Sequence, residues 1–115
     1  MTYKLFLDDI RDPRTTPAYF GFDDDFFKDM VIARSYDEAA KILHRNGLPY
    51  VLLLDYHLGD NNYSGFDVVK HFISKAEIDP SELDPDFKYY IHTDSQVCGM
   101  LMEKALKKFL ERIGR

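Results

Sequence analysis

Polar side chains that could do chemistry follow three short apolar runs in this chain of 115 residues. Asp8 and Asp9 follow the first run, Asp55 follows the second, and His92 with Thr93 follow the third. Close carboxylates repel each other unless a cation, a proton or a basic group offsets their charge. Together the three aspartates therefore predict a divalent cation site, for Mg²⁺, with Mn²⁺ or another transition metal as alternatives. Taken singly, each aspartate could instead cap its strand or the following turn.

Two histidines stand close to these acids in the sequence. His92 follows a buried run directly, where it could donate to a phosphate, exchange protons or bind a metal, and the hydroxyl of Thr93 could hold a phosphoryl oxygen. His57 lies two residues after Asp55, so it faces the same side if the strand continues. A site residue and a simple loop histidine both remain open for His57. We expect His92, together with His57, to carry proton transfer.

Arg11 is the basic residue nearest to the acidic pair. Its guanidinium could clamp a phosphate through two hydrogen bonds, or it could be the internal counter-ion of the acids. The helix expected after Thr93 would add free backbone N–H groups, which favour an anion.

The elements that must position these residues alternate along the chain. Apolar runs predict strands, capping signals and apolar stripes predict helices, and segments rich in proline and acids predict loops. The predicted strands are residues 3–7, 30–33, 50–54 and 88–91. The predicted helices are residues 35–45, one that begins at residue 64 and one that begins at residue 95 or 96. The predicted loops are residues 12–29, which include a short helix near Phe26, and residues 77–86. This alternation indicates an α/β fold with a parallel sheet, whose ligands bind at the carboxyl ends of the strands.

Composition limits the remaining possibilities. The length suits a single domain over residues 1–115, and the net charge of −5 argues against broad binding to nucleic acid. The single cysteine, Cys98, allows no internal disulfide and suits the cytoplasm. No apolar run approaches the roughly 20 residues of a membrane helix, so we expect no membrane partner.

The segments Leu7-Asp8-Asp9, Leu54-Asp55 and Ile91-His92-Thr93 together resemble a response-regulator receiver domain. The resemblance implies a flavodoxin-like or receiver-like three-layer sandwich, with a mostly parallel four-stranded sheet of order 2-1-3-4. It also implies that Asp8 and Asp9 bind Mg²⁺, that Asp55 accepts a phosphoryl group, and that Thr93 contacts this group. Receivers continue into a fifth strand, which ends in a lysine, and a fifth helix. Here we expect that strand and helix to be lacking.

A closer resemblance is to a receiver-derived family proposed to process cyclic phosphates. Four motifs carry it in order, namely residues 7–13 (LDDIRDP), 54–59 (LDYHLG), 65–68 (GFDV) and 91–93 (IHT). The second motif departs from the family pattern, because Tyr56 and His57 stand where the pattern has histidine and aspartate.

These observations lead to three hypotheses on function. The first is metal-assisted processing or binding of a phosphorylated small molecule, a nucleotide or an RNA end, with a cyclic phosphate as one such ligand. In it Asp8, Asp9 and Asp55 hold the cation, His92 and His57 transfer protons, and Arg11 and Thr93 hold phosphate oxygens. The second is a phosphoacceptor receiver with Asp55 as acceptor. The third is a non-catalytic protein-interaction module, whose partner is unknown, using the basic last helix or the aromatic loop around Phe20, Phe22, Phe26 and Phe27.

Overall fold

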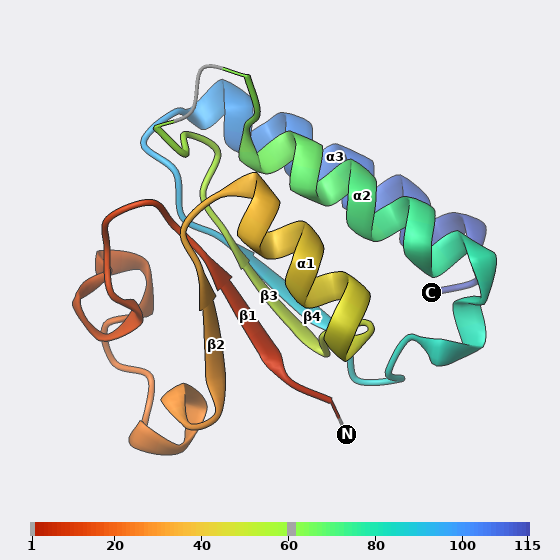
Figure 1. The fold of residues 1–115 in the computed structure, drawn as a ribbon, viewed down its shortest axis with the longest axis horizontal. Helices are drawn as coiled ribbons and strands as arrows, with labels where there is room; N and C mark the ends of the chain where they lie inside the picture. Colours follow the sequence, from red (N-terminus) through yellow and green to blue (C-terminus); the bar gives the residue numbers. More distant parts are fainter. Residues whose placement is uncertain (1, 60–61) are drawn as a thin grey trace.

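A computed structural model describes residues 2–59 and 62–115, and it contains every strand and α-helix that the sequence predicts. The strands are β1 (Lys4–Leu7), β2 (Met30–Ala33), β3 (Val51–Leu54) and β4 (Lys88–Ile91). The α-helices are α1 (Tyr36–Asn46), α2 (Gly65–Ile78) and α3 (Gln96–Arg112). All strand pairs are parallel and the order is β2-β1-β3-β4, which confirms the receiver-like α/β fold (Figure 1). The described residues include no fifth strand.

One face of the sheet is covered by the α-helices, which lie side by side in the order α1, α2, α3 (Figure 1). Leu5 and Leu7 of β1 face this layer, as alternation along a strand requires. The core between sheet and helices is fully buried and contains Leu52, Leu54, Val69, Phe72, Met102, Leu106 and Phe109. Its aliphatic and aromatic side chains hold the strands from one side only.

The opposite face of the sheet is covered by the segment between β1 and β2, which makes the third layer of the sandwich. This segment contains the 3-10 helices η1 (Pro13–Thr15), η2 (Pro17–Tyr19) and η3 (Asp24–Phe27), where the sequence predicted a loop with one short helix. Phe6 of β1 packs there with the buried ring of Tyr19. The third layer is therefore a compact loop, not an α-helix.

Helices α1 and α2 begin where the capping signals placed them. Ser64 and Asp67 form the capping box of α2, with the N–H of Ser64 donating to the Asp67 carboxylate at 2.7 Å. Ser35 caps α1 by accepting from the N–H of Glu38. The Glu38 carboxylate, however, accepts from the N–H of Arg34 and not from that of the cap residue. The second box is therefore half formed, and Arg34 is held at the start of the helix.

Helix α3 packs with a slightly different stripe from the one its sequence predicts. Cys98, Met102, Ala105, Phe109 and Ile113 were expected to share the core face. Met102 and Phe109 are fully buried, whereas Leu106, outside that stripe, is buried with them. Cys98, Ala105 and Ile113 are half-buried at its margins. Among the described residues, no helix is long and apolar enough to cross a membrane.

Gly65 sets the distance between α2 and the end of β3. Its N–H donates to the carbonyl oxygen of Tyr56 at 2.7 Å. A Cβ atom on Gly65 would lie 1.8 Å from the carbonyl oxygen of Asp55, far inside van der Waals contact. The helix can therefore approach the backbone of Asp55 only because residue 65 has no side chain.

We predict that Gly65→Ala lowers the free energy of unfolding by about 3 kcal/mol, since backbone must move to admit the methyl group. Gly21→Ala is the matched control: Gly21 has a φ of +94°, but a Cβ atom there would meet no atom within 4 Å, so only about 1 kcal/mol of backbone strain is expected. Urea denaturation of both variants measures the two losses. Equal losses would show that the close approach at Asp55 does not matter.

Candidate functional site

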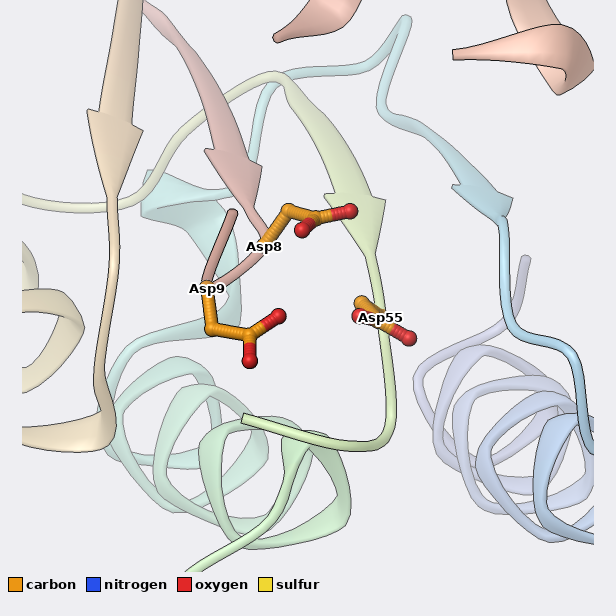
Figure 2. A group of neighbouring side chains, drawn as sticks. All are labelled: Asp8, Asp9 and Asp55. Atoms are coloured by element: carbon orange, nitrogen blue, oxygen red, sulfur yellow. The ribbon is translucent and has the colours of Figure 1, made fainter. Parts of the chain in front are cut away.

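The carboxylates of Asp8, Asp9 and Asp55 meet at the carboxyl ends of β1 and β3 (Figure 2). One oxygen from each lies within 4.8 Å of the others. The parallel register pairs Leu7 with Leu54, so the residues that follow these two must emerge side by side. This grouping is the only candidate metal cluster among residues 2–59 and 62–115, and it includes neither histidine of the sequence hypothesis.

Asp8 is the buried member of the cluster and is held by its own turn. Its Oδ1 accepts from the N–H groups of Ile10 at 3.0 Å and Arg11 at 2.9 Å. Its Oδ2 lies 3.2 Å from Nε2 of His92, and both side chains are 1% exposed. Within the described part of the chain, neither of these two atoms makes a hydrogen bond of good geometry. Asp8 Oδ2 therefore keeps unused capacity to bind a cation or accept a better-aligned proton.

The pKa of the Asp55 carboxyl group is shifted by its surroundings. Burial, followed by the negative charge of Asp8 and then that of Asp9, raises the pKa of Asp55 to about 6. The backbone N–H groups of Tyr56 and His57 oppose this rise by favouring the charged carboxylate. The cluster thus carries an excess of negative charge that a bound cation would offset.

His92 lies behind Asp8, between the sheet and the loop layer. Its ring stacks on Phe6 with centroids 4.9 Å apart, and its Nδ1 lies 2.5 Å from the hydroxyl oxygen of Tyr19. Burial lowers the pKa of His92 to about 4, although Asp8 acts in the opposite direction. The ring is therefore neutral near pH 7 and carries one proton, on one of its two nitrogens.

Tyr19 was missed by the sequence hypothesis. It belongs to the aromatic loop, which shows no pattern that points to the site, and 73 positions separate it from His92. Burial and the charge of Asp8 raise the pKa of Tyr19 above its usual value, so its hydroxyl keeps its proton.

His57 does not join the carboxylates. Strand β3 ends at Leu54, so the alternation that would turn His57 toward the site stops before it. The side chain is exposed and its ring lies against Tyr56, with centroids 5.0 Å apart. It remains a rim residue, in reach of solvent.

Arg11 and Thr93 lie on the loops that border the site. Arg11 Nη2 is 3.5 Å from the carboxylate of Asp94, and the two side chains are 38% and 86% exposed. The Thr93 hydroxyl oxygen accepts from the N–H of Ser95 at 3.3 Å. The observed ion-pair partner of Arg11 is thus Asp94, and its link to the acidic cluster is the backbone N–H that Asp8 accepts.

Arg34 is a second residue that the sequence hypothesis missed. Its guanidinium donates to the carbonyl oxygens of Asp8 and Arg11 and lies 3.1 Å from the Asp12 carboxylate. A basic residue directly after an apolar strand was the available signal. Arg34 fastens the turn that carries Asp8 and Asp9 to the end of β2.

Sheet order and acidic cluster together define a receiver-like domain. The model of one family, the cyclic-phosphate processing receiver domains, matches residues 3–108. The chain therefore belongs to this family, as its four sequence motifs indicated. A search of curated proteins and a search of solved structures each gave no match.

We predict that Asp55→Asn stabilises the metal-free protein at neutral pH but not in acid. The folded-state pKa of about 6 exceeds the ordinary value of 3.8, so the folded state binds this proton more tightly. Asp55 therefore becomes destabilising as the pH rises from about 4 to above 6, by about 2 kcal/mol after allowance for partial exposure. Urea denaturation in EDTA at pH 4 and pH 7.5 measures the difference between variant and wild type.

The exposed Asp86, outside the cluster, supplies the matched control. Asp86→Asn removes the same charge, and its stability difference from wild type should stay nearly constant over this pH range. A pH-independent difference for Asp55→Asn as well would contradict the strain attributed to the cluster.

Proposed function

We propose that this domain binds a divalent cation through Asp8, Asp9 and Asp55 and uses it to bind or process a phosphorylated ligand. The ligand class is a cyclic phosphate, a nucleotide or an RNA end. The observation that carries the proposal is the set of carboxylate oxygens within 4.8 Å of one another, one of them on a buried side chain. Membership of the cyclic-phosphate processing receiver family supports a cyclic phosphate as the ligand.

The donor set fits a hard cation. Every candidate ligand is a carboxylate oxygen, which suits Mg²⁺ or Mn²⁺ better than a soft metal. Burial first, and then the negative charges of Asp8 and Asp9, raise the pKa of Asp55, and a bound cation would relieve the part that is due to charge. A bound cation would supply charge to polarise a phosphoryl group and to acidify a water molecule.

The chain's own residues would handle the phosphate from the rim. The Arg11–Asp94 contact is long and exposed, so it is worth at most about 1 kcal/mol and can be exchanged for a phosphate oxygen. Thr93 and the start of α3 lie on the neighbouring loop and offer a hydroxyl and backbone N–H groups. Exposed His57 is the histidine that can exchange protons directly with a ligand.

The phosphoacceptor alternative keeps one favourable observation, the half-buried Asp55 beside Asp8 and Asp9. No fifth strand occurs in the described ranges to present the receiver lysine. Intact-mass measurement after incubation with a small phosphodonor and Mg²⁺ tests it, and a single added phosphoryl group that is absent in Asp55→Asn would favour it.

The interaction-module alternative loses most of its aromatic surface. Phe22, Phe26 and Phe27 pack against the core beneath the loop, and Phe20 alone of this set is largely exposed. These rings are used for folding, so the aromatic loop offers a partner little surface.

Cation binding is the first test. We predict that the wild type binds Mg²⁺ or Mn²⁺ in titration calorimetry and that Asp55→Asn weakens binding at least tenfold, about 1.4 kcal/mol. Asp86→Asn should leave the affinity unchanged. Absence of binding of either cation by the wild type would overturn the proposed metal site.

Arg11 supplies a separate test of phosphate recognition. We predict that Arg11→Gln weakens binding of cyclic nucleotides about tenfold in the presence of cation while cation affinity stays constant, because the ion-pair partner of the guanidinium is Asp94 and not a cation ligand. Arg14→Gln is the matched control, since Arg14 lies on the same loop but pairs with Asp24. Equal losses in both variants would show a general charge effect and exclude a specific role for Arg11.

A further inference from the structure

We propose that Tyr19 is a positioning residue, whose hydroxyl donates to Nδ1 of His92 and thereby directs the N–H at Nε2 toward Asp8. His92 then acts on the site through Asp8 and not by contact with the ligand. The inference rests on the proposed function only in taking Asp8 as a cation ligand.

The three side chains form a chain of one hydrogen bond and one close contact from the loop layer to the carboxylates. The Tyr19 hydroxyl oxygen lies 2.5 Å from Nδ1 of His92, and Nε2 on the other side of the ring lies 3.2 Å from Oδ2 of Asp8. All three residues are at most 5% exposed, so water has little access to this chain. Its groups must satisfy one another or remain unpaired at a cost.

The number of protons available decides which group donates and which accepts between Tyr19, His92 and Asp8. An ionised Asp8 can only accept, so the facing nitrogen of His92 must carry the ring proton to be attracted to it. A neutral ring then leaves Nδ1 as an acceptor, which requires a donor on the other side. The hydroxyl of Tyr19 is that donor, whereas the opposite tautomer would place two lone pairs face to face at Asp8.

Packing holds the hydroxyl in place. The ring of Tyr19 meets the rings of Phe6, Phe22 and Tyr90 edge to face, at centroid distances of 6.1, 5.7 and 6.3 Å. Phe6 also stacks on His92 with the planes 3° from parallel. The rings of Tyr19 and His92 cannot turn without disturbing this cluster. The aromatic core therefore fixes the position of the Tyr19 hydroxyl relative to the imidazole.

This arrangement changes the role expected of His92. Both of its ring nitrogens face protein groups and its side chain is 1% exposed, so no nitrogen is turned toward a ligand. Asp8 accepts two backbone N–H groups on Oδ1, and Nε2 of His92 lies 3.2 Å from Oδ2, so both carboxylate oxygens have neighbours that restrict its orientation. Direct proton exchange with a ligand is left to exposed His57.

The tautomer itself is the first measurement. Long-range ¹H–¹⁵N correlation spectra of the full chain, recorded in EDTA near pH 7.5, distinguish the protonated nitrogen of each of the four histidines. We expect His92, assigned with a His92→Gln variant, to be neutral and protonated at Nε2. Protonation at Nδ1, or at both nitrogens, would overturn the proposal.

Removal of the hydroxyl is the second measurement. Tyr19→Phe should keep the ring packing but move the Nδ1 signal of His92 or populate the second tautomer, and it should weaken Mn²⁺ binding about threefold to tenfold. Tyr90→Phe is the matched control, because Tyr90 belongs to the same aromatic cluster but its hydroxyl makes no hydrogen bond to His92 in the described structure. An unchanged His92 spectrum in Tyr19→Phe would overturn the proposal, as would an equal change in Tyr90→Phe.

The two proposals can fail separately. Absence of cation binding by the wild type removes the proposed metal site, while the histidine spectra still decide whether Tyr19 sets the tautomer. If Tyr19→Phe does not fold, the wild-type tautomer remains a decisive result. Normal cation binding with His92 protonated at Nδ1 would preserve the proposed function and overturn the role of Tyr19.

Discussion

Repulsion among carboxylates that the sheet forces together is the constraint on which this site depends. Because β1 and β3 are adjacent, parallel and in register at Leu7 and Leu54, Asp8 and Asp55 must emerge next to each other. The fold offsets part of the cost with backbone N–H groups, while burial and, after it, the charges of Asp8 and Asp9 raise the pKa of Asp55. A site built in this way attracts a cation even when no ligand is bound.

The features that depend on local sequence could be predicted. Strands follow from apolar runs, the start of α2 follows from Ser64 and Asp67, and the carboxyl-terminal positions of Asp8 and Asp55 follow from where their runs end. Each of these needs only neighbouring residues or the period of an element. Sheet order then follows once the chain is compared with a receiver, and it brings the three acids together.

The features that depend on distant contacts could not be predicted. Tyr19 reaches His92 across 73 positions, and nothing in its neighbourhood distinguishes it from the other aromatics of the loop. Arg34 directly follows an apolar strand, but two of its three partners are backbone carbonyl oxygens, which no pattern of side chains identifies. His57 was uncertain because its orientation depended on whether β3 continued past Leu54, a boundary that apolar content alone does not define.

The loop layer explains how so small a domain can bury the row of polar groups formed by Tyr19, His92 and Asp8. An α-helix on this face would present a stripe of side chains at fixed spacing, whereas the loop can place one tyrosine over Phe6 and His92. Such a loop must be fastened, because its backbone lacks an α-helix ladder. Arg34 holds its first turn at the carboxyl end of β1, and Lys4 holds η3 at the amino end by donating to the carbonyl oxygens of Asp25 and Phe26. Because both ends of the loop are bonded to Arg34 and Lys4, packing in the core fixes the position of Tyr19. Through Tyr19 and His92 the loop is connected to the site.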